Sequence, residues 1–141
     1  MKRLILYVFI IMFISCKKEK DSFIINLQDT TPLNIVEFQQ NIFVTLNYQH
    51  PDGYVGFSNP DQLSLEIKDS RLDSSDYYHL IPVNPPNHVL SVQGEILVEI
   101  DAPFIFGNGN EETVIFKIRI QDTNMQWSNY IETPAIIINK Q

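Results

Sequence analysis

The sequence predicts an antiparallel β-sandwich that follows an N-terminal export segment. From Leu33 onward, apolar and polar residues alternate with a period of two, which is typical of strands buried on one face. Turn-forming residues interrupt this alternation at intervals of roughly ten residues, as they do in small all-β sandwiches. No stretch of the expected domain places its apolar residues at helical spacing. These observations favour two packed sheets over a helical or mixed fold.

Each expected strand rests on its own pattern. In residues 42–48 the even-numbered side chains are all apolar or aromatic, and a Pro-Asp-Gly turn follows at 51–53. Residues 63–69 alternate in the same way, and residues 113–121 follow a tight-turn cluster at 107–110. The other expected strands are 77–82, 89–101 and 135–139. About seven strands joined by short loops favour an immunoglobulin or fibronectin type III arrangement over a barrel.

Residues 1–15 have the layout of a secretory signal. Lys2 and Arg3 provide a positive start, and an unbroken apolar run of eleven residues follows at 4–14. A helix of that length rises only about 16 Å, roughly half of a hydrocarbon core, so we do not expect a permanent membrane span. A charged run begins directly after Cys16 and marks the end of the apolar block.

The residues Phe13-Ile14-Ser15-Cys16 resemble a bacterial lipobox, the site at which lipoprotein signal peptidase cuts before a cysteine that becomes lipidated. The resemblance implies a lipid anchor on Cys16 that holds the protein at the outer membrane, on either the periplasmic face or the cell surface. It divides the chain into a signal peptide at 1–15, a lipidated cysteine with its tether at 16–32, and a domain at 33–141. More than one lipid chain gives stable anchoring, because a single chain binds only marginally.

Charge and cysteine content limit the possible partners. The chain has 10 Lys and Arg against 17 Asp and Glu, a net charge of −7 that becomes −9 if Lys2 and Arg3 leave with the signal. We expect no nucleic acid partner, because no basic stripe is available to contact phosphates. Cys16 is the only cysteine, so the expected domain has neither a disulfide nor a cysteine-based zinc site.

Two stretches, Ile42–Phe57 and Ile118–Ile138, resemble a group of small Bacteroidota lipoproteins that carry an immunoglobulin-like domain. In that group an Asp-Gly-Asp-Gly-Asp loop follows a strand ending in Tyr, and His50-Pro51-Asp52-Gly53 stands at the corresponding place here. The closing pattern of the group is matched by Asp122, Ser128-Asn129 and Glu132-Thr133-Pro134. The resemblance implies a fold and a location in the cell envelope, and no activity.

The sequence offers little that could bind a metal. Calcium takes about six to eight oxygen ligands, and of the acidic loop only Asp52 is present, with Asp61 some distance on. We therefore expect a turn rather than a calcium site. The other acidic cluster lacks the spacing of an EF-hand, and the histidines lack the spacing of a metal site; these residues are Asp69, Asp73 and Asp76, and His50, His79 and His88. No cofactor is expected.

Aromatic residues carry the only binding signal. No Gly-x-Ser-x-Gly elbow is present, and no serine has a context that marks it as a nucleophile, so we do not expect an enzyme. Tyr77, Tyr78, Trp127 and Tyr130 lie in or beside expected loops, where flat rings recognise sugars or proteins. The alternative is that these rings close the ends of the core. The candidate binding loops are Pro51–Pro60, Ser70–Asp76, Pro82–His88 and Asp122–Asn129.

These features together predict a non-enzymatic lipoprotein of the cell envelope, anchored through Cys16, that serves a structural or protein-interaction role. Its partner would be another envelope protein or a glycan. The alternative from another class is a surface module that captures carbohydrate or a divalent cation as an accessory to uptake. The two differ in one observable, because a capture module gains thermal stability when its ligand binds.

Overall fold

The computed structural model describes residues 23–51, 53–82 and 92–141, and all structural statements below concern these residues. The signal segment 1–15, Cys16 and Asp52 lie outside them, as does most of the expected loop Pro82–His88. The described residues form strands and no helix, and so contain no helix that could cross a membrane. In chain order the strands are β1 (Ile24–Thr31), β2 (Asn34–Val36), β3 (Ile42–His50), β4 (Leu63–Asp69), β5 (Asp76–His79), β6 (Val92–Ile100), β7 (Glu111–Val114), β8 (Phe116–Ile120), β9 (Ile131–Glu132) and β10 (Ile136–Asn139).

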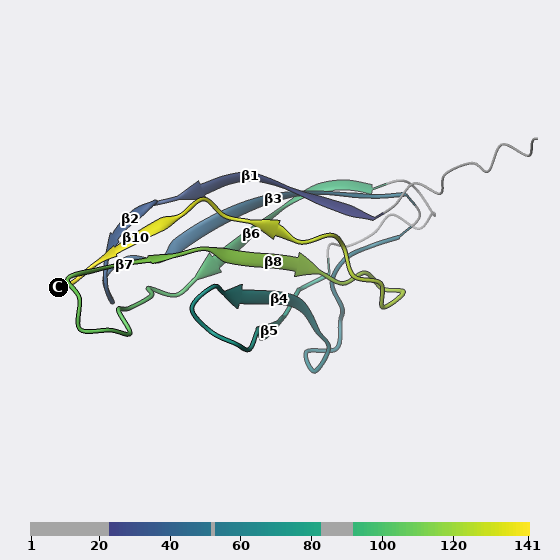
Figure 1. The fold of residues 1–141 in the computed structure, drawn as a ribbon. Coiled ribbons are helices and arrows are strands. Elements are labelled where there is room, and N and C mark those ends of the chain that lie inside the picture. The colour runs from purple at the N-terminus through teal and green to yellow at the C-terminus, as the bar shows by residue number, and fades with distance from the viewer. Residues whose placement is uncertain (1–22, 52, 83–91) are drawn as a thin grey trace, which may run out of the picture.

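One layer is an antiparallel sheet in the order β1-β3-β6 (Figure 1). Its central strand β3 was the clearest prediction, and the burial pattern confirms it, because its even-numbered residues from Ile42 to His50 are all buried. In β6, Ile96 and Val98 are buried while their neighbours are exposed, as the alternation of 89–101 predicts.

The other layer contains β2, β4, β5 and the four strands from β7 through β10. The strand orders are β5-β4-β8-β9 and β2-β10-β7, and only Ile115 separates β7 from β8. Because β7 pairs with β10 and β8 pairs with β9, the two short sheets are consecutive halves of one bent layer. The single strand predicted at 113–121 is therefore corrected to two, which pair with different partners on either side of Ile115.

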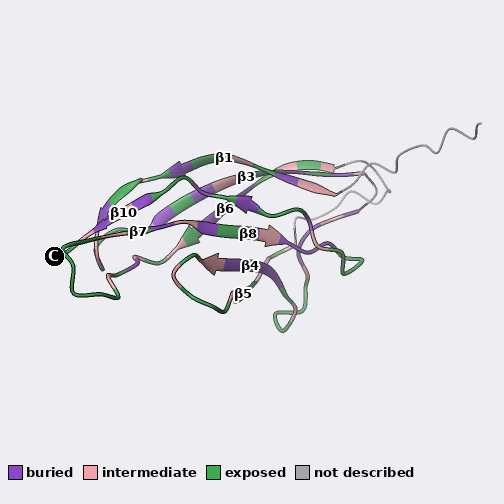
Figure 2. Ribbon diagram, in the orientation of Figure 1, coloured by how far each residue is buried: buried purple, intermediate pink, exposed green. Residues whose placement is uncertain are grey.

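The core lies between the two layers. Its largest fully buried side chains come from both sheets, with Ile42 and Leu46 on β3, Ile118 on β8, and Ile136 and Ile138 on β10. Buried residues alternate with half-buried or exposed ones along these strands (Figure 2). The structure thus confirms the predicted all-β sandwich. The finer assignment to an immunoglobulin or fibronectin type III arrangement stays a prediction.

The domain begins earlier than the sequence pattern predicted. Residues 16–32 were expected to be a tether, but Ile24–Thr31 form β1, which pairs along its length with β3. Ile25 is fully buried in the core. After Thr31 the chain crosses to the other layer, where β2 pairs in parallel with β10. The predicted domain boundary at Leu33 is therefore wrong, and the sandwich includes residues from at least Ile24.

Polar residues of the closing pattern hold the strand ends together. The Asn129 side chain accepts a hydrogen bond from the Ile25 amide and donates one to the Ile25 carbonyl, each 2.9 Å long, and so joins β1 to the segment before β9. The hydroxyl oxygens of Ser128 and Thr133 accept hydrogen bonds from the amides of Ile120 and Phe116, at 3.1 and 3.0 Å. These residues satisfy buried backbone donors at positions where the strand ladders are interrupted.

Candidate functional site

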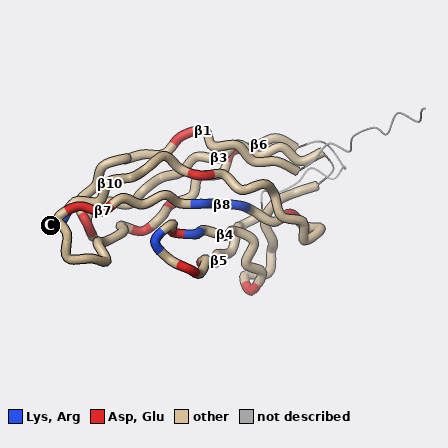
Figure 3. Tube along the Cα trace, in the orientation of Figure 1, with Lys and Arg blue, Asp and Glu red and all other residues tan. Residues whose placement is uncertain are grey.

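A row of polar and aromatic side chains crosses the outer face of the sheet formed by β5, β4, β8 and β9. Glu66 of β4 lies opposite Tyr77 of β5 on one side and opposite Arg119 of β8 on the other. Both charged residues stand between inward-facing apolar neighbours, so the strand alternation turns them away from the core. Most described basic residues gather on this layer, around β4 and β8 (Figure 3).

Glu66 is the polar centre of this row. The Nε of Arg119 donates a hydrogen bond to its Oε2 at 2.5 Å, while the hydroxyls of Ser75 and Tyr130 donate to its Oε1 at 2.8 and 3.1 Å. Its side chain is only 3% exposed. Burial acts to raise the pKa of Glu66, but the three hydrogen bonds and the positive charge of Arg119 outweigh it and hold the pKa below its ordinary value.

Arg119 lies between two aromatic rings. The carbon of its guanidinium group is 4.5 Å from the ring centroid of Trp127 and 4.4 Å from that of Tyr130. The ring of Tyr77 contacts Trp127 edge-on, with the centroids 6.3 Å apart. We call Glu66, Tyr77, Arg119, Trp127 and Tyr130 the aromatic–arginine face. Cation–π contacts and the buried carboxylate fix these side chains in place before any partner binds.

The aromatic–arginine face is held in place and is also accessible. Tyr77 and Tyr130 are each 46% exposed, and Trp127 is half-buried. Burial, together with its hydrogen bond to the carboxylate of Glu66, raises the pKa of Tyr130, so its hydroxyl remains a proton donor at neutral pH. The face therefore presents flat apolar area with polar groups at its centre.

The structure brings together three of the four predicted aromatic residues. Tyr77, Trp127 and Tyr130 meet on the aromatic–arginine face, whereas Tyr78 points to the other side of β5, because successive residues of a strand face opposite ways. Tyr77 and Tyr78 lie on β5, within the strand expected at 77–82 and directly after the expected loop Ser70–Asp76. Sequence analysis missed Glu66 and Arg119, although each is a charged residue flanked by two buried apolar residues.

A buried His–Asp pair lies at one end of the sandwich. The Nε2 of His50 is 2.9 Å from the Oδ2 of Asp122, and the two side chains are 3% and 2% exposed. The Oδ1 of Asp122 also accepts hydrogen bonds from the backbone amides of Asn124 and Gln126, at 2.9 and 2.7 Å. The pair therefore joins the turn after β8 to the end of β3.

Asp52 lies outside the described residues, and the metal candidates within them do not gather into a site. Asp61 is exposed in a turn, where its amide donates a hydrogen bond to the side chain of Asn59. Asp69, from the other acidic cluster, pairs with Arg71 at 2.6 Å. Within residues 23–51, 53–82 and 92–141 no three His, Cys, Asp or Glu side chains come close enough to hold a metal ion.

A second aromatic cluster was not foreseen. Phe38, Phe104 and Phe106 come from two loops at the end of the sandwich near the C-terminus. All three are exposed, and the ring of Phe104 contacts both of the others. Phe38 has a positive φ of 61°, a conformation that costs about 1 kcal/mol or more for a residue with a side chain. The guanidinium of Arg71 lies 4.1 Å from the ring centroid of Phe106. Single phenylalanines in separate loops gave no local signal of this contact.

The charge state of Glu66 should make the stability of the protein depend on pH. Because its pKa in the folded protein is below the ordinary 4.5, the unfolded chain binds the proton more readily. The stabilisation by Glu66 is therefore present above pH 4.5 and is lost as the pH falls through the folded pKa. We expect Glu66→Gln to lower the free energy of unfolding by about 2 kcal/mol at pH 7, and by less in acid.

Urea unfolding of both proteins from pH 7 to about pH 3.5 tests this expectation. Glu132→Gln is the matched control, because the pair formed by Glu132 and Lys117 is solvent-exposed and contributes little. If the free energy of unfolding of Glu66→Gln stayed below that of the wild type by the same amount across this pH range, the expectation would be contradicted.

Comparisons with protein families, with curated proteins and with solved structures found no match to this chain.

Proposed function

We propose that this protein is a lipid-anchored, non-enzymatic module of the cell envelope that binds another envelope protein through the aromatic–arginine face. The observation that carries the proposal is the stacking of Arg119 between Trp127 and Tyr130, over a carboxylate that fixes its direction. Trp, Tyr and Arg are the residues that most often dominate protein–protein binding energy. A flat sheet face suits a protein surface better than it suits a reaction that needs an enclosed site.

Preorganisation favours binding by this face. A flexible arginine or tyrosine on a surface loses roughly 0.5–1.5 kcal/mol of side-chain entropy when a partner immobilises it. Here the hydrogen bonds to Glu66 and the ring stacking already restrict Arg119 and Tyr130. A partner therefore contacts side chains that lose little further freedom.

The anchor belongs to the proposal through the lipobox resemblance of Phe13-Ile14-Ser15-Cys16. With β1 beginning at Ile24, seven residues separate Cys16 from the first strand, and the eight steps from Cys16 to Ile24 span at most about 28 Å when fully extended. The domain is then held close to the outer membrane. Its partner is expected at the same membrane, on whichever side the anchored domain faces.

The second candidate function is carbohydrate capture at the cell surface as an accessory to uptake. It is favoured by the exposed rings of Tyr77 and Tyr130 beside hydrogen-bonding groups, a combination that also suits sugar rings. A captured sugar raises the melting temperature by mass action. A glycan that stabilises the wild-type chain and not Trp127→Ala would support this candidate over a protein partner.

Cross-linking in the producing cells tests the protein-binding proposal. A photoreactive phenylalanine analogue replaces Tyr77 in the full-length chain, or, as the control, replaces Asp29, which is exposed on β1 in the other layer. We expect a discrete protein adduct from position 77 and none from position 29. Equal adducts from both positions, or none from either, would contradict the proposal.

A further inference from the structure

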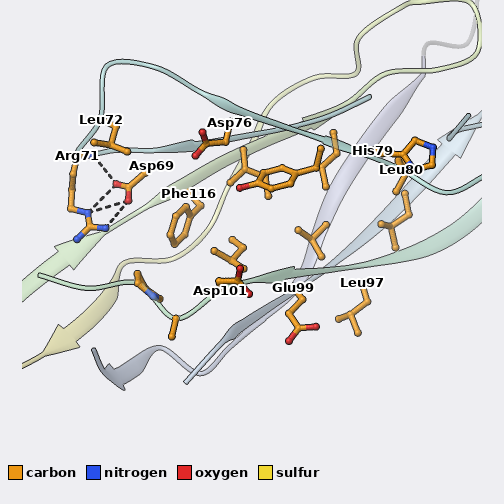
Figure 4. Close-up of a pocket in the computed structure, with 18 of the residues that line it drawn as sticks. Asp69, Arg71, Leu72, Asp76, His79, Leu80, Leu97, Glu99, Asp101 and Phe116 are labelled. Atoms are coloured by element: carbon orange, nitrogen blue, oxygen red, sulfur yellow. Dashed lines mark hydrogen bonds and ion pairs between the residues drawn. The ribbon is translucent and has the colours of Figure 1, made fainter. Parts of the chain in front are cut away.

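A cavity of about 660 Å³ opens between the free edges of the two layers, on the side bounded by β5 and β6 (Figure 4). It is distinct from the aromatic–arginine face, because Tyr77 and Tyr78 project to opposite sides of β5. Its volume lies in the range of about 300–1,000 Å³ that is typical of small-molecule sites.

The walls of the cavity are apolar, while its mouth is acidic. The walls are formed by core side chains of both layers, namely Leu65, Ile67, Ile96, Val98, Ile100 and Phe116. Asp76 lies on one side of the mouth and Asp101 on the other (Figure 4). Both Asp76 and Asp101 are exposed, and no described basic side chain forms an ion pair with either of them.

The hydroxyl of Tyr78 lies in the electric field of both aspartates. Burial raises the pKa of Tyr78, and the negative charges of Asp76 and Asp101 raise it further. The two carboxylates, from different layers, therefore act on one point inside the mouth. A positive charge placed at that point would be attracted by both of them.

The arginine at the cavity is already engaged. The guanidinium of Arg71 donates to both oxygens of Asp69, at 2.6 Å for the shorter bond to Oδ2, and lies 3.4 Å from a carboxylate oxygen of Glu112. It also packs over the ring of Phe106 at one end of the cavity. Arg71 therefore does not neutralise the mouth, where the negative charge is uncompensated by the described residues.

We propose that this cavity binds a small apolar molecule that carries a positive charge, with its apolar part between the two layers and its cationic group between Asp76 and Asp101. Removal of apolar surface from water and attraction to the two carboxylates both favour such a ligand. The ligand class is that of an aromatic or alkyl amine, small enough to enter an opening of this volume.

A small molecule fits this edge better than an inserted peptide strand. Asp76 of β5 lies opposite Ile67 of β4, so its side chain is on the inward face of an edge strand. An inward-pointing charge on an edge strand is a device by which proteins prevent another strand from pairing there. The same carboxylate that disfavours an added strand can contact the ammonium group of a small ligand.

Three probes with the same indole ring test the proposal: tryptamine, which is cationic, tryptophol, which is neutral, and indole-3-propionate, which is anionic. Binding of each to the full-length chain in lipid nanodiscs is measured by ligand-observed NMR at low ionic strength, and binding to empty nanodiscs is subtracted. We expect tryptamine to bind at least about tenfold more tightly than the anionic probe, and the preference to fall as salt is added.

Two double variants locate the effect. The first variant, Asp76→Asn with Asp101→Asn, should abolish the preference for tryptamine. The control variant, Asp29→Asn with Asp61→Asn, removes the same amount of charge from exposed positions elsewhere, so the preference for tryptamine should remain. Equal binding of the three probes, no binding of tryptamine, or a preference that survives in the first double variant would overturn the proposal. Binding of an extended Lys-containing apolar peptide in place of tryptamine would also overturn it and assign the edge to strand addition.

Discussion

Asp122→Ala is expected to lower the free energy of unfolding by about 3 kcal/mol. The variant removes the carboxylate that contacts His50 and that accepts hydrogen bonds from the backbone amides of Asn124 and Gln126. Both amides then lie in a partly buried turn without this acceptor. The ring of His50 cannot move aside easily, because it packs against Phe23 and against Gly53, where a Cβ atom would lie 2.4 Å from the ring.

Urea unfolding followed through the single tryptophan measures this loss. Asp122→Asn retains an oxygen for the two amides and should lose only about 1 kcal/mol. Asp29→Ala, on the exposed surface of β1, should stay within about 0.5 kcal/mol of wild type. If Asp122→Ala proved as stable as the Asp29→Ala control, the buried pair would not hold this end of the sandwich together.

Cys16→Ala is expected to abolish lipid-anchored membrane association and to leave unprocessed precursor. Without the thiol, no diacylglyceryl group can be attached, and by the lipobox resemblance the signal peptidase then does not cut. By the same resemblance, a wild-type chain processed before Cys16 would have 126 residues and would carry more lipid than the two acyl chains that suffice for stable anchoring. The effect should therefore be complete rather than partial.

Mass spectrometry of the isolated protein and fractionation of the cells test this prediction. Ser15→Ala is the matched control, because it retains a small residue before the cut and should be processed and anchored as wild type. A Cys16→Ala protein that matures and stays with the membrane fraction would show that the lipobox assignment is wrong.

Strand alternation predicted the fold where each strand keeps one face in the core. The central strand β3 and the strand β4 were located within two residues at each end, because their patterns are local. The break at Ile115 could not be predicted, since the alternation runs through it unchanged while the pairing partner switches from β10 to β4 and β9. β1 was missed because the charged run after Cys16 made the whole segment resemble a tether.

The candidate site was predictable only in part. The sequence singled out Tyr77, Trp127 and Tyr130 as aromatic residues near turns, but not their contact with one another. That contact depends on the register that sets Glu66 opposite both Tyr77 and Arg119, and register is a property of the paired strands. The one sequence signal that pointed to this site was a charged residue between two buried apolar residues, which occurs at Glu66 and at Arg119.

We expect the aromatic–arginine face to bind its protein partner through Trp127 and the arginine stacked on it. The most direct test is the yield of the cross-link from position 77 when Trp127→Ala is added, with Phe104→Ala, in the separate phenylalanine cluster, as a matched control. Because Trp127 supports the stacked arginine, we expect the yield to fall about tenfold or more with Trp127→Ala and to persist with Phe104→Ala. An adduct of unchanged yield in the folded Trp127→Ala protein would contradict the account.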